Sequence, residues 1–130
     1  MSDYTLVNFS DAEDMAAKHG LAPNLESRFL RTHMDADHLG VSSFKVAPGF
    51  RVPFGHRHEV QEEAYVVTSG SGRFKLEDEI LDVRQGDVLR VAPTVMRGFE
   101  AGPEGMEMIA IGSDRPEEGD GDLTPGWWND

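Results

Sequence analysis

Short segments in which apolar and polar residues alternate run along most of the chain after Glu26, and glycine and proline separate them. Successive side chains of a β-strand point to opposite faces of a sheet, so a period of two indicates strands with one buried face. We expect strands at residues 27–33, 41–47, 64–68, 73–77, 80–83, 87–91 and 106–111, with turns at residues 48–49, 69–72, 85–87 and 102–103. Many short strands at near-regular spacing are typical of an all-β sandwich or barrel.

The pattern divides the chain into an N-terminal arm of residues 1–25, a barrel of residues 26–112 and a tail of residues 113–130. The arm predicts one short helix over residues 10–20. Ser10 and Glu13 would form its capping box, and Gly20 would end it. We expect this helix to lie against the barrel and to carry no chemistry.

The tail is acidic and rich in glycine and proline, which favours an irregular surface segment. Trp127 and Trp128 are the exception, because two adjacent tryptophans are rarely left in water. At least one of them is expected to pack on the barrel wall or on a second subunit.

Composition excludes several classes of function. The chain has 130 residues and a net charge of −12, which argues against binding to nucleic acid or to anionic membrane surfaces. It has no cysteine, so disulfides, thiolate metal sites and a cysteine nucleophile are excluded. Neither a signal peptide nor a transmembrane segment is readable, and we expect a cytoplasmic protein.

Two imidazoles and a carboxylate are expected on one face near the middle of the chain. His56 and His58 are two residues apart in an extended segment, so both rings point to the same side. Glu63 shares an inward strand face with Tyr65, and a buried carboxylate is unfavourable unless it is paired or bound to a cation. Two histidines and one carboxylate can bind Fe, Mn, Ni, Zn or Cu and leave positions open for a substrate.

The spacing of these residues resembles a known motif. His56-x-His58, four residues, Glu63, six residues and Gly70 together resemble the first conserved motif of the cupin superfamily, and residues 86–93 resemble the start of its second motif. The resemblance covers residues 40–112. It implies a double-stranded β-helix (a cupin or jelly-roll barrel), as in the small single-domain type-2 cupins, which are often homodimeric.

The same resemblance implies a site inside the barrel mouth, with His56, His58 and Glu63 as metal ligands. The count to Gly70 favours Glu63 over Glu62 as the carboxylate. The implied cofactor is a divalent transition metal.

Arg97 stands where the second cupin motif usually has a further histidine ligand, and no histidine follows His58. In one interpretation the guanidinium pairs with Glu63 and takes the place of a cation. In another, a metal sits on the three ligands and Arg97 orients an anionic group of a substrate. In a third, Arg97 points outward and serves neither purpose. Because a guanidinium repels a nearby divalent cation, the sequence favours weak or vacant metal occupancy.

The remaining polar candidates are assigned from their positions. Tyr65 and Gln61 lie on or beside the ligand strand and are expected to contact a ligand together with Arg97, whereas His33 and His38 are expected at the surface. The predicted function is a small-molecule-binding cupin with a partial metal site. The alternative is a metal-dependent cupin enzyme (an oxygenase, isomerase or decarboxylase) that acts on a small organic anion. No catalytic residue is assigned.

Overall fold

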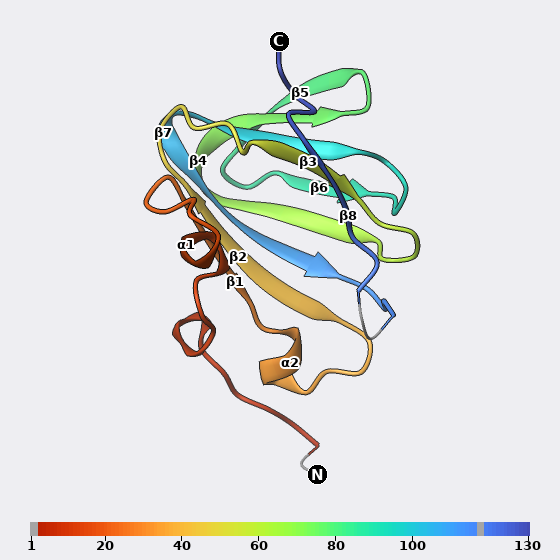
Figure 1. Ribbon diagram of the computed structural model, residues 1–130. Coiled ribbons are helices and arrows are strands. Elements are labelled where there is room, and N and C mark those ends of the chain that lie inside the picture. Colours follow the sequence, from red (N-terminus) through yellow and green to blue (C-terminus); the bar gives the residue numbers. More distant parts are fainter. Residues whose placement is uncertain (1–2, 117–118) are drawn as a thin grey trace.

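Eight strands make up nearly half of the protein, and its structure, a computed structural model, describes residues 3–116 and 119–130 (Figure 1). The strands are β1 (Leu25–Phe29), β2 (Gly40–Val46), β3 (Phe54–Arg57), β4 (Glu63–Leu76), β5 (Glu79–Arg84), β6 (Val88–Val91), β7 (Arg97–Gly112) and β8 (Asp122–Pro125). The helical turns are η1 (Phe9–Asp11), α1 (Met15–Lys18) and α2 (Arg31–Met34). None of the helices in the described ranges has the length and apolar character of a membrane span.

The strands form one antiparallel sheet that curls on itself (Figure 1). One path runs β1-β2-β7-β3-β8, and β4 pairs with β7, with β6 along its first part and with β5 along its second. The long strands β4 and β7 extend from the Glu63–Gly112 pair to the Leu76–Arg97 pair. Glu63 and Arg97 therefore start at opposite ends of this ladder. The curl of the sheet brings the two side chains together inside the barrel, where Nη2 of Arg97 lies 3.4 Å from Oε1 of Glu63.

Strand β4 replaces a pair of shorter strands in the expected pattern, and β7 runs through residues 102–103, where a turn was expected. Residues 69–72 were expected to turn, but β4 continues through them with register shifts against β7. Tyr65 and Val67 are buried before the shift, and Phe74 is buried after it, so the inward face changes from odd to even positions. Gly70 is required there, because its φ is 77° and an added β-carbon would lie 2.0 Å from the carbonyl oxygen of Gly105.

The interior is apolar and aromatic, as the alternation predicted. Tyr65 and Phe74 lie 5.0 Å apart between ring centroids, and Phe74 lies 5.4 Å from Phe99. Eleven inward-facing residues are buried in the core or packed against it: Phe44, Val46, Phe54, Tyr65, Val67, Phe74, Leu76, Leu89, Val91, Phe99 and Met108. Their burial stabilises the barrel by about 1.5–3 kcal/mol for each fully buried side chain.

A short N-terminal helix is present, but its expected extent and cap are wrong. The capping box that forms is Asn8–Asp11, and the second helix begins after Asp14, whose Oδ1 accepts hydrogen bonds from the amides of Ala16 and Ala17. The same Asp14 oxygen accepts from the amide of Ser27 at 3.0 Å. The chain breaks into two turns because Asp14 caps the second turn while it ties that turn to β1.

Part of the C-terminal segment is ordered against the barrel. Strand β8 pairs with β3, and Figure 1 shows it running beside that strand. Trp128 is buried, with the Arg51 guanidinium 4.1 Å and the Arg73 guanidinium 5.3 Å from its ring centroid. The expectation that at least one tryptophan packs on the barrel is confirmed.

Candidate metal centre

The two histidines lie at the end of β3 and point the same way, as the alternation predicted. His56 is in β3, and His58 follows its last residue, where its amide donates to the Pro93 carbonyl at 2.7 Å. The two ring centroids are 5.2 Å apart, with side chains that are 19% and 12% exposed. Both imidazoles are therefore mostly buried and keep a small exposed fraction.

Glu63, the first residue of β4, brings its carboxylate between the two rings. Its Oε1 lies 3.4 Å from Nε2 of His56 and 3.3 Å from Nε2 of His58. One ligand atom from each residue lies within 4.8 Å of the other two. Glu62 forms an exposed ion pair with Arg90 at 2.8 Å instead, which confirms Glu63 as the carboxylate of the cluster.

Tyr65 supports this carboxylate from inside the barrel. Its hydroxyl donates to Oε1 of Glu63 at 2.8 Å and lies 3.4 Å from Nε2 of His56. Burial, together with the Glu63 charge, raises the pKa of Tyr65 well above its usual value. The hydroxyl therefore keeps its proton at all physiological pH values and remains a donor.

Arg97 faces inward, so the interpretation in which it points to solvent is wrong. Its side chain is fully buried, and its Nη1 donates to the carbonyls of Pro93 at 3.1 Å and Val95 at 2.8 Å. Its Nη2 lies 3.4 Å from Oε1 of Glu63, but Nε and Nη2 have no hydrogen-bond partner within the described ranges. Two buried donors on one edge of the guanidinium are thus left for another acceptor.

Gln61 lies beside the cluster without joining it. Its side chain packs where a β-carbon on Gly112 would fall, 1.8 Å from its Nε2. Its backbone amide donates to Asp120 at 2.9 Å. A ligand-binding role for Gln61 stays a prediction. His33 and His38 are exposed, as expected.

Asp120 is a member of the site that the sequence did not identify. Its side chain is 1% exposed, its Oδ1 lies 2.8 Å from Nδ1 of His58, and its Oδ2 accepts from the amides of Val60 at 2.7 Å and Gln61 at 2.9 Å. Burial acts against ionisation, but these hydrogen bonds lower the pKa of Asp120 to about 2. In the sequence it is one of several acidic residues in a glycine-rich tail, so no local signal distinguishes it.

The surroundings of Glu63 and His58 shift the pKa of both groups. Burial acts to raise the pKa of Glu63, but the nearby imidazoles of His56 and His58 and the hydrogen bond from Tyr65 hold it well below its usual range. Burial acts to lower the pKa of His58, but Glu63 and Asp120 raise it. Glu63 is therefore a carboxylate at neutral pH, which a metal ligand has to be.

The donor set fits a divalent metal. Because a carboxylate accepts the hydrogen bond at Nδ1 of His58, that nitrogen carries the proton and Nε2 keeps its lone pair. Within the described residues this buried Nε2 has no hydrogen-bond partner, although it lies within ion-pair distance of Glu63. A buried nitrogen lone pair that faces a carboxylate and a second imidazole is suited to a metal.

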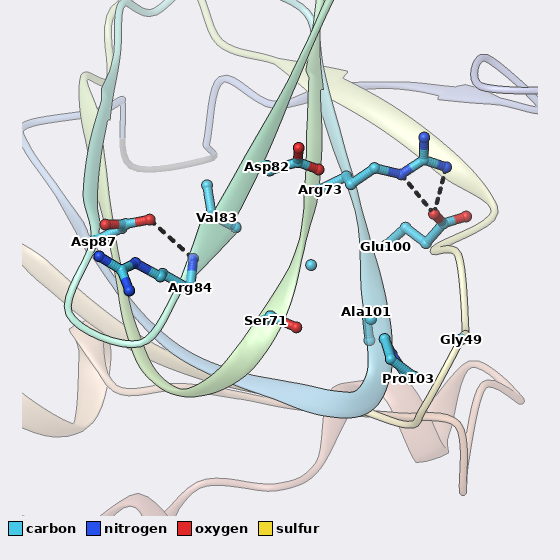
Figure 2. A pocket seen from close by; sticks show the side chains of 12 residues that line it. Gly49, Ser71, Arg73, Asp82, Val83, Arg84, Asp87, Glu100, Ala101 and Pro103 are labelled. Atoms are coloured by element: carbon cyan, nitrogen blue, oxygen red, sulfur yellow. Dashed lines mark hydrogen bonds and ion pairs between the residues drawn. The ribbon is translucent and has the colours of Figure 1, made fainter.

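A large groove elsewhere on the barrel is separate from this cluster. It has a volume of about 860 Å³ and lies between β4, β5 and β7 (Figure 2). Figure 2 shows Arg73 turned toward Glu100, to which it donates at 2.7 and 3.1 Å. None of the residues that line the groove belongs to the His56–His58–Glu63 cluster.

Solved structures share this fold. A cupin protein from Bacteroides fragilis is 23% identical, with a TM-score of 0.71 over 90% of this chain and 89% of that one. The polyketide cyclase RemF from Streptomyces resistomycificus is 22% identical, with a TM-score of 0.72 over 97% and 87%. A tryptophan-to-tyrosine variant of oxalate decarboxylase from Bacillus subtilis is 22% identical, with a TM-score of 0.71 over 89% of this chain and 32% of that one.

These likenesses support the double-stranded β-helix with a short N-terminal helix. Comparison with curated protein sequences finds no match. The family model for the cupin domain matches residues 42–112, a segment that holds His56, His58, Glu63 and Arg97. Because the match covers more than half of the chain, the protein belongs to the cupin superfamily, as a small cupin domain.

Proposed function

We propose that this cupin binds a divalent transition metal through His56, His58 and Glu63 and holds a small organic anion beside it. The observation that carries the proposal is the state of His58. Its Nε2 is buried, has no hydrogen-bond partner in the described part of the chain, and lies 3.3 Å from Oε1 of Glu63. Leaving a buried polar atom unsatisfied destabilises a fold by about 1–3 kcal/mol unless a ligand compensates.

The chemical type of the three ligand atoms limits which metals suit the site. Two imidazole nitrogens and one carboxylate oxygen suit Fe, Mn, Ni, Zn and Cu better than Mg or Ca, which prefer oxygen ligands. The Arg97 guanidinium lies 3.4 Å from the Glu63 carboxylate and would repel a cation bound there. We therefore expect weaker metal binding than in a cupin with a histidine at this position.

The bound anion would be recognised by Arg97. Its Nη1 is held by two backbone carbonyls, which fixes the guanidinium in place. Its Nε and Nη2 form one edge of the planar fork, the arrangement that binds a carboxylate through two hydrogen bonds. The buried, partnerless donors therefore favour an organic carboxylate or enolate as the small organic ligand.

The chemistry of such a site follows from its residues. A bound metal would polarise an oxygen of the ligand as a Lewis acid. Arg97 would orient the anionic group, and the Tyr65 hydroxyl would hold a proton beside Glu63, 2.8 Å from Oε1. The partial exposure of His56 and His58 gives the ligand a path to the site.

A metal-dependent enzyme is the second candidate, and the Tyr65 hydroxyl favours it. A positioned proton donor next to a metal site is useful for isomerisation or decarboxylation but is not needed for binding alone. Similar structures include an oxalate decarboxylase and proteins described as DMSP lyases. Turnover of small carboxylates by the metal-loaded protein, abolished in Tyr65→Phe while metal is retained, would distinguish an enzyme from a binding protein.

The metal proposal is tested by elemental analysis of untagged protein, supplied in turn with each of the five metals. We expect about one metal ion per chain and its loss in His58→Ala. His38→Ala is the matched control, because His38 is an exposed histidine 3.0 Å from a carboxylate of Asp114. Metal-free wild-type protein, or equal loss in both variants, would contradict the proposal.

We also propose that the chain forms a homodimer through the outer face of its sheet. Val66 pairs with Ile109 on one side and Val88 on the other, and Ile111 lies on the same outward face. Val88 and Ile111 are exposed. A contiguous apolar patch on a sheet is typical of a protein interface. Light scattering of Val88→Glu, compared with wild type, would show a monomer if this face forms the dimer, and an unchanged dimer would contradict it.

A further inference from the structure

We propose that Asp120 is a positioning residue of the metal centre, which holds the His58 ring with Nδ1 protonated and presents Nε2 to the metal. This inference rests on the proposed function. The contact that carries it is the 2.8 Å distance between Oδ1 of Asp120 and Nδ1 of His58. A histidine bound to a metal through one nitrogen commonly donates its other N–H to a carboxylate, which fixes the ring and makes the free nitrogen more basic.

The Asp120 carboxylate is itself held in place. Its Oδ2 accepts from the backbone amides of Val60 and Gln61 at 2.7 and 2.9 Å, so the side chain cannot rotate without losing two hydrogen bonds. Its side chain is 1% exposed, which excludes water as a competitor for His58. A carboxylate with both oxygens engaged in this way orients the imidazole more strictly than a solvated one.

The residues that follow Asp120 in the sequence hold its segment against the barrel. We call residues 119–128 the C-terminal strap. Its strand β8 pairs with β3 so that Leu123 lies opposite His56, and the Gly126 amide donates to the Pro53 carbonyl at 2.9 Å. The buried Trp128 ends the strap, and its ring lies against the guanidinium groups of Arg51 and Arg73.

The strap therefore contacts the strand of one histidine and the ring of the other. It pairs through its backbone with the strand that holds His56, and it contacts His58 through Asp120. In the described part of the chain, Asp120 makes hydrogen bonds to His58 and to two backbone amides and to none of the other ligand residues. It therefore acts on a metal through His58 and is not itself a ligand of the cluster.

The first test is metal affinity, measured by titrating Zn²⁺ into metal-free protein against a competing chelator. We expect Asp120→Asn to bind Zn²⁺ about 10- to 100-fold more weakly than wild type. Asp122→Asn is the matched control, because it removes an acidic residue of the same strap whose side chain is 63% exposed and pairs with Arg57 at 3.5 Å. We expect its affinity to equal that of wild type. Equal affinity in Asp120→Asn and wild type would overturn the inference.

The second test needs no metal, and its deciding measurement is made on the wild-type protein. Nitrogen-15 chemical shifts of the His58 ring in metal-free wild-type protein report its tautomer, and we expect the Nδ1–H form. In Asp120→Asn we expect a shift toward a mixture of tautomers, while circular dichroism checks that the variant is folded. A predominant Nε2–H tautomer in the wild type would overturn the inference even if the variant fails to fold.

The two tests separate this inference from the proposed function. If the wild type binds no Zn²⁺, the metal proposal fails, and the tautomer alone decides whether Asp120 orients His58. If the wild type binds Zn²⁺ and Asp120→Asn binds it equally well, the metal proposal stands and Asp120 has no positioning role.

Discussion

The buried Arg97 guanidinium lies 3.4 Å from Oε1 of Glu63, the oxygen that also lies between His56 and His58. One carboxylate oxygen thus faces both the metal-binding nitrogens and a permanent cation. We predict that Arg97→Gln binds Zn²⁺ at least about tenfold more tightly than wild type, a change of about 1.4 kcal/mol, because it removes a repelling charge. Calorimetric titration would measure it, and weaker binding by the variant would contradict the prediction.

The free energy of unfolding of the metal-free protein should have an optimum pH and should fall at lower and at higher pH. The pKa of Asp120 falls from 3.8 to about 2 on folding. The Asp120 carboxylate therefore contributes fully to the free energy of unfolding above about pH 4, and this contribution is lost as pH falls toward 2. With allowance for solvent screening, we expect this contribution to be about 1 kcal/mol. The pKa of His58 is raised above 6.5, so its contribution is complete below pH 6.5 and is lost as pH rises through the higher folded value.

Urea unfolding of wild type and Asp120→Asn between pH 2 and 8 checks this dependence. The stability difference between the two proteins should be constant between pH 4 and 6 and should shrink as pH falls to 2. A difference that stays constant down to pH 2 would show that Asp120 is not ionised at an unusually low pH.

The strap packs tightly against Gly55 of β3 and more loosely against Gly98 of β7. A β-carbon on Gly55 would lie 2.5 Å from Cε3 of Trp127, whereas one on Gly98 would lie 3.5 Å from Cζ3 of the same ring. We predict that Gly55→Ala lowers the free energy of unfolding by about 1–3 kcal/mol and that Gly98→Ala leaves it nearly unchanged. Thermal unfolding of both variants measures this, and equal midpoints would contradict the packing described.

Trp128 should contribute more to stability than its neighbour Trp127. Trp128 is buried and lies against two guanidinium groups, whereas Trp127 is half-buried and has the Lys75 ammonium 4.7 Å from its ring. We expect Trp128→Ala to lower the free energy of unfolding by about 3–5 kcal/mol and Trp127→Ala to lower it by less. If urea unfolding gave the reverse order, the strap would be anchored elsewhere than at Trp128.

The barrel and four site residues were predictable because they depend on local alternation. Two-residue spacing placed His56 and His58 on one face, and the same alternation placed Glu63 and Tyr65 inside. The continuity of β4 was not predictable in this way, because the glycines that allow its bulge and its close approach to β7 look like a turn in the sequence.

Asp120 and β8 were not predictable, because they depend on contacts between distant parts of the chain. Strand β8 is four residues long and pairs with a strand that precedes it by more than sixty residues in the sequence. Its composition resembles that of a solvated tail, and Asp120 gains its role from backbone amides of Val60 and Gln61. The direction of Arg97 was open for a different reason. It is set by the backbone carbonyls of the nearby Pro93 and Val95, whose directions the residue pattern does not give.

The central claim is that His56, His58 and Glu63 bind a metal even though Arg97 lies beside them. Anomalous diffraction from crystals grown with Zn²⁺, recorded on both sides of the zinc absorption edge, tests it most directly. We predict one anomalous peak per chain, about 2.0–2.2 Å from Nε2 of each histidine and from a carboxylate oxygen of Glu63. No peak at this position, with Arg97 donating directly to Glu63 in its place, would contradict the account.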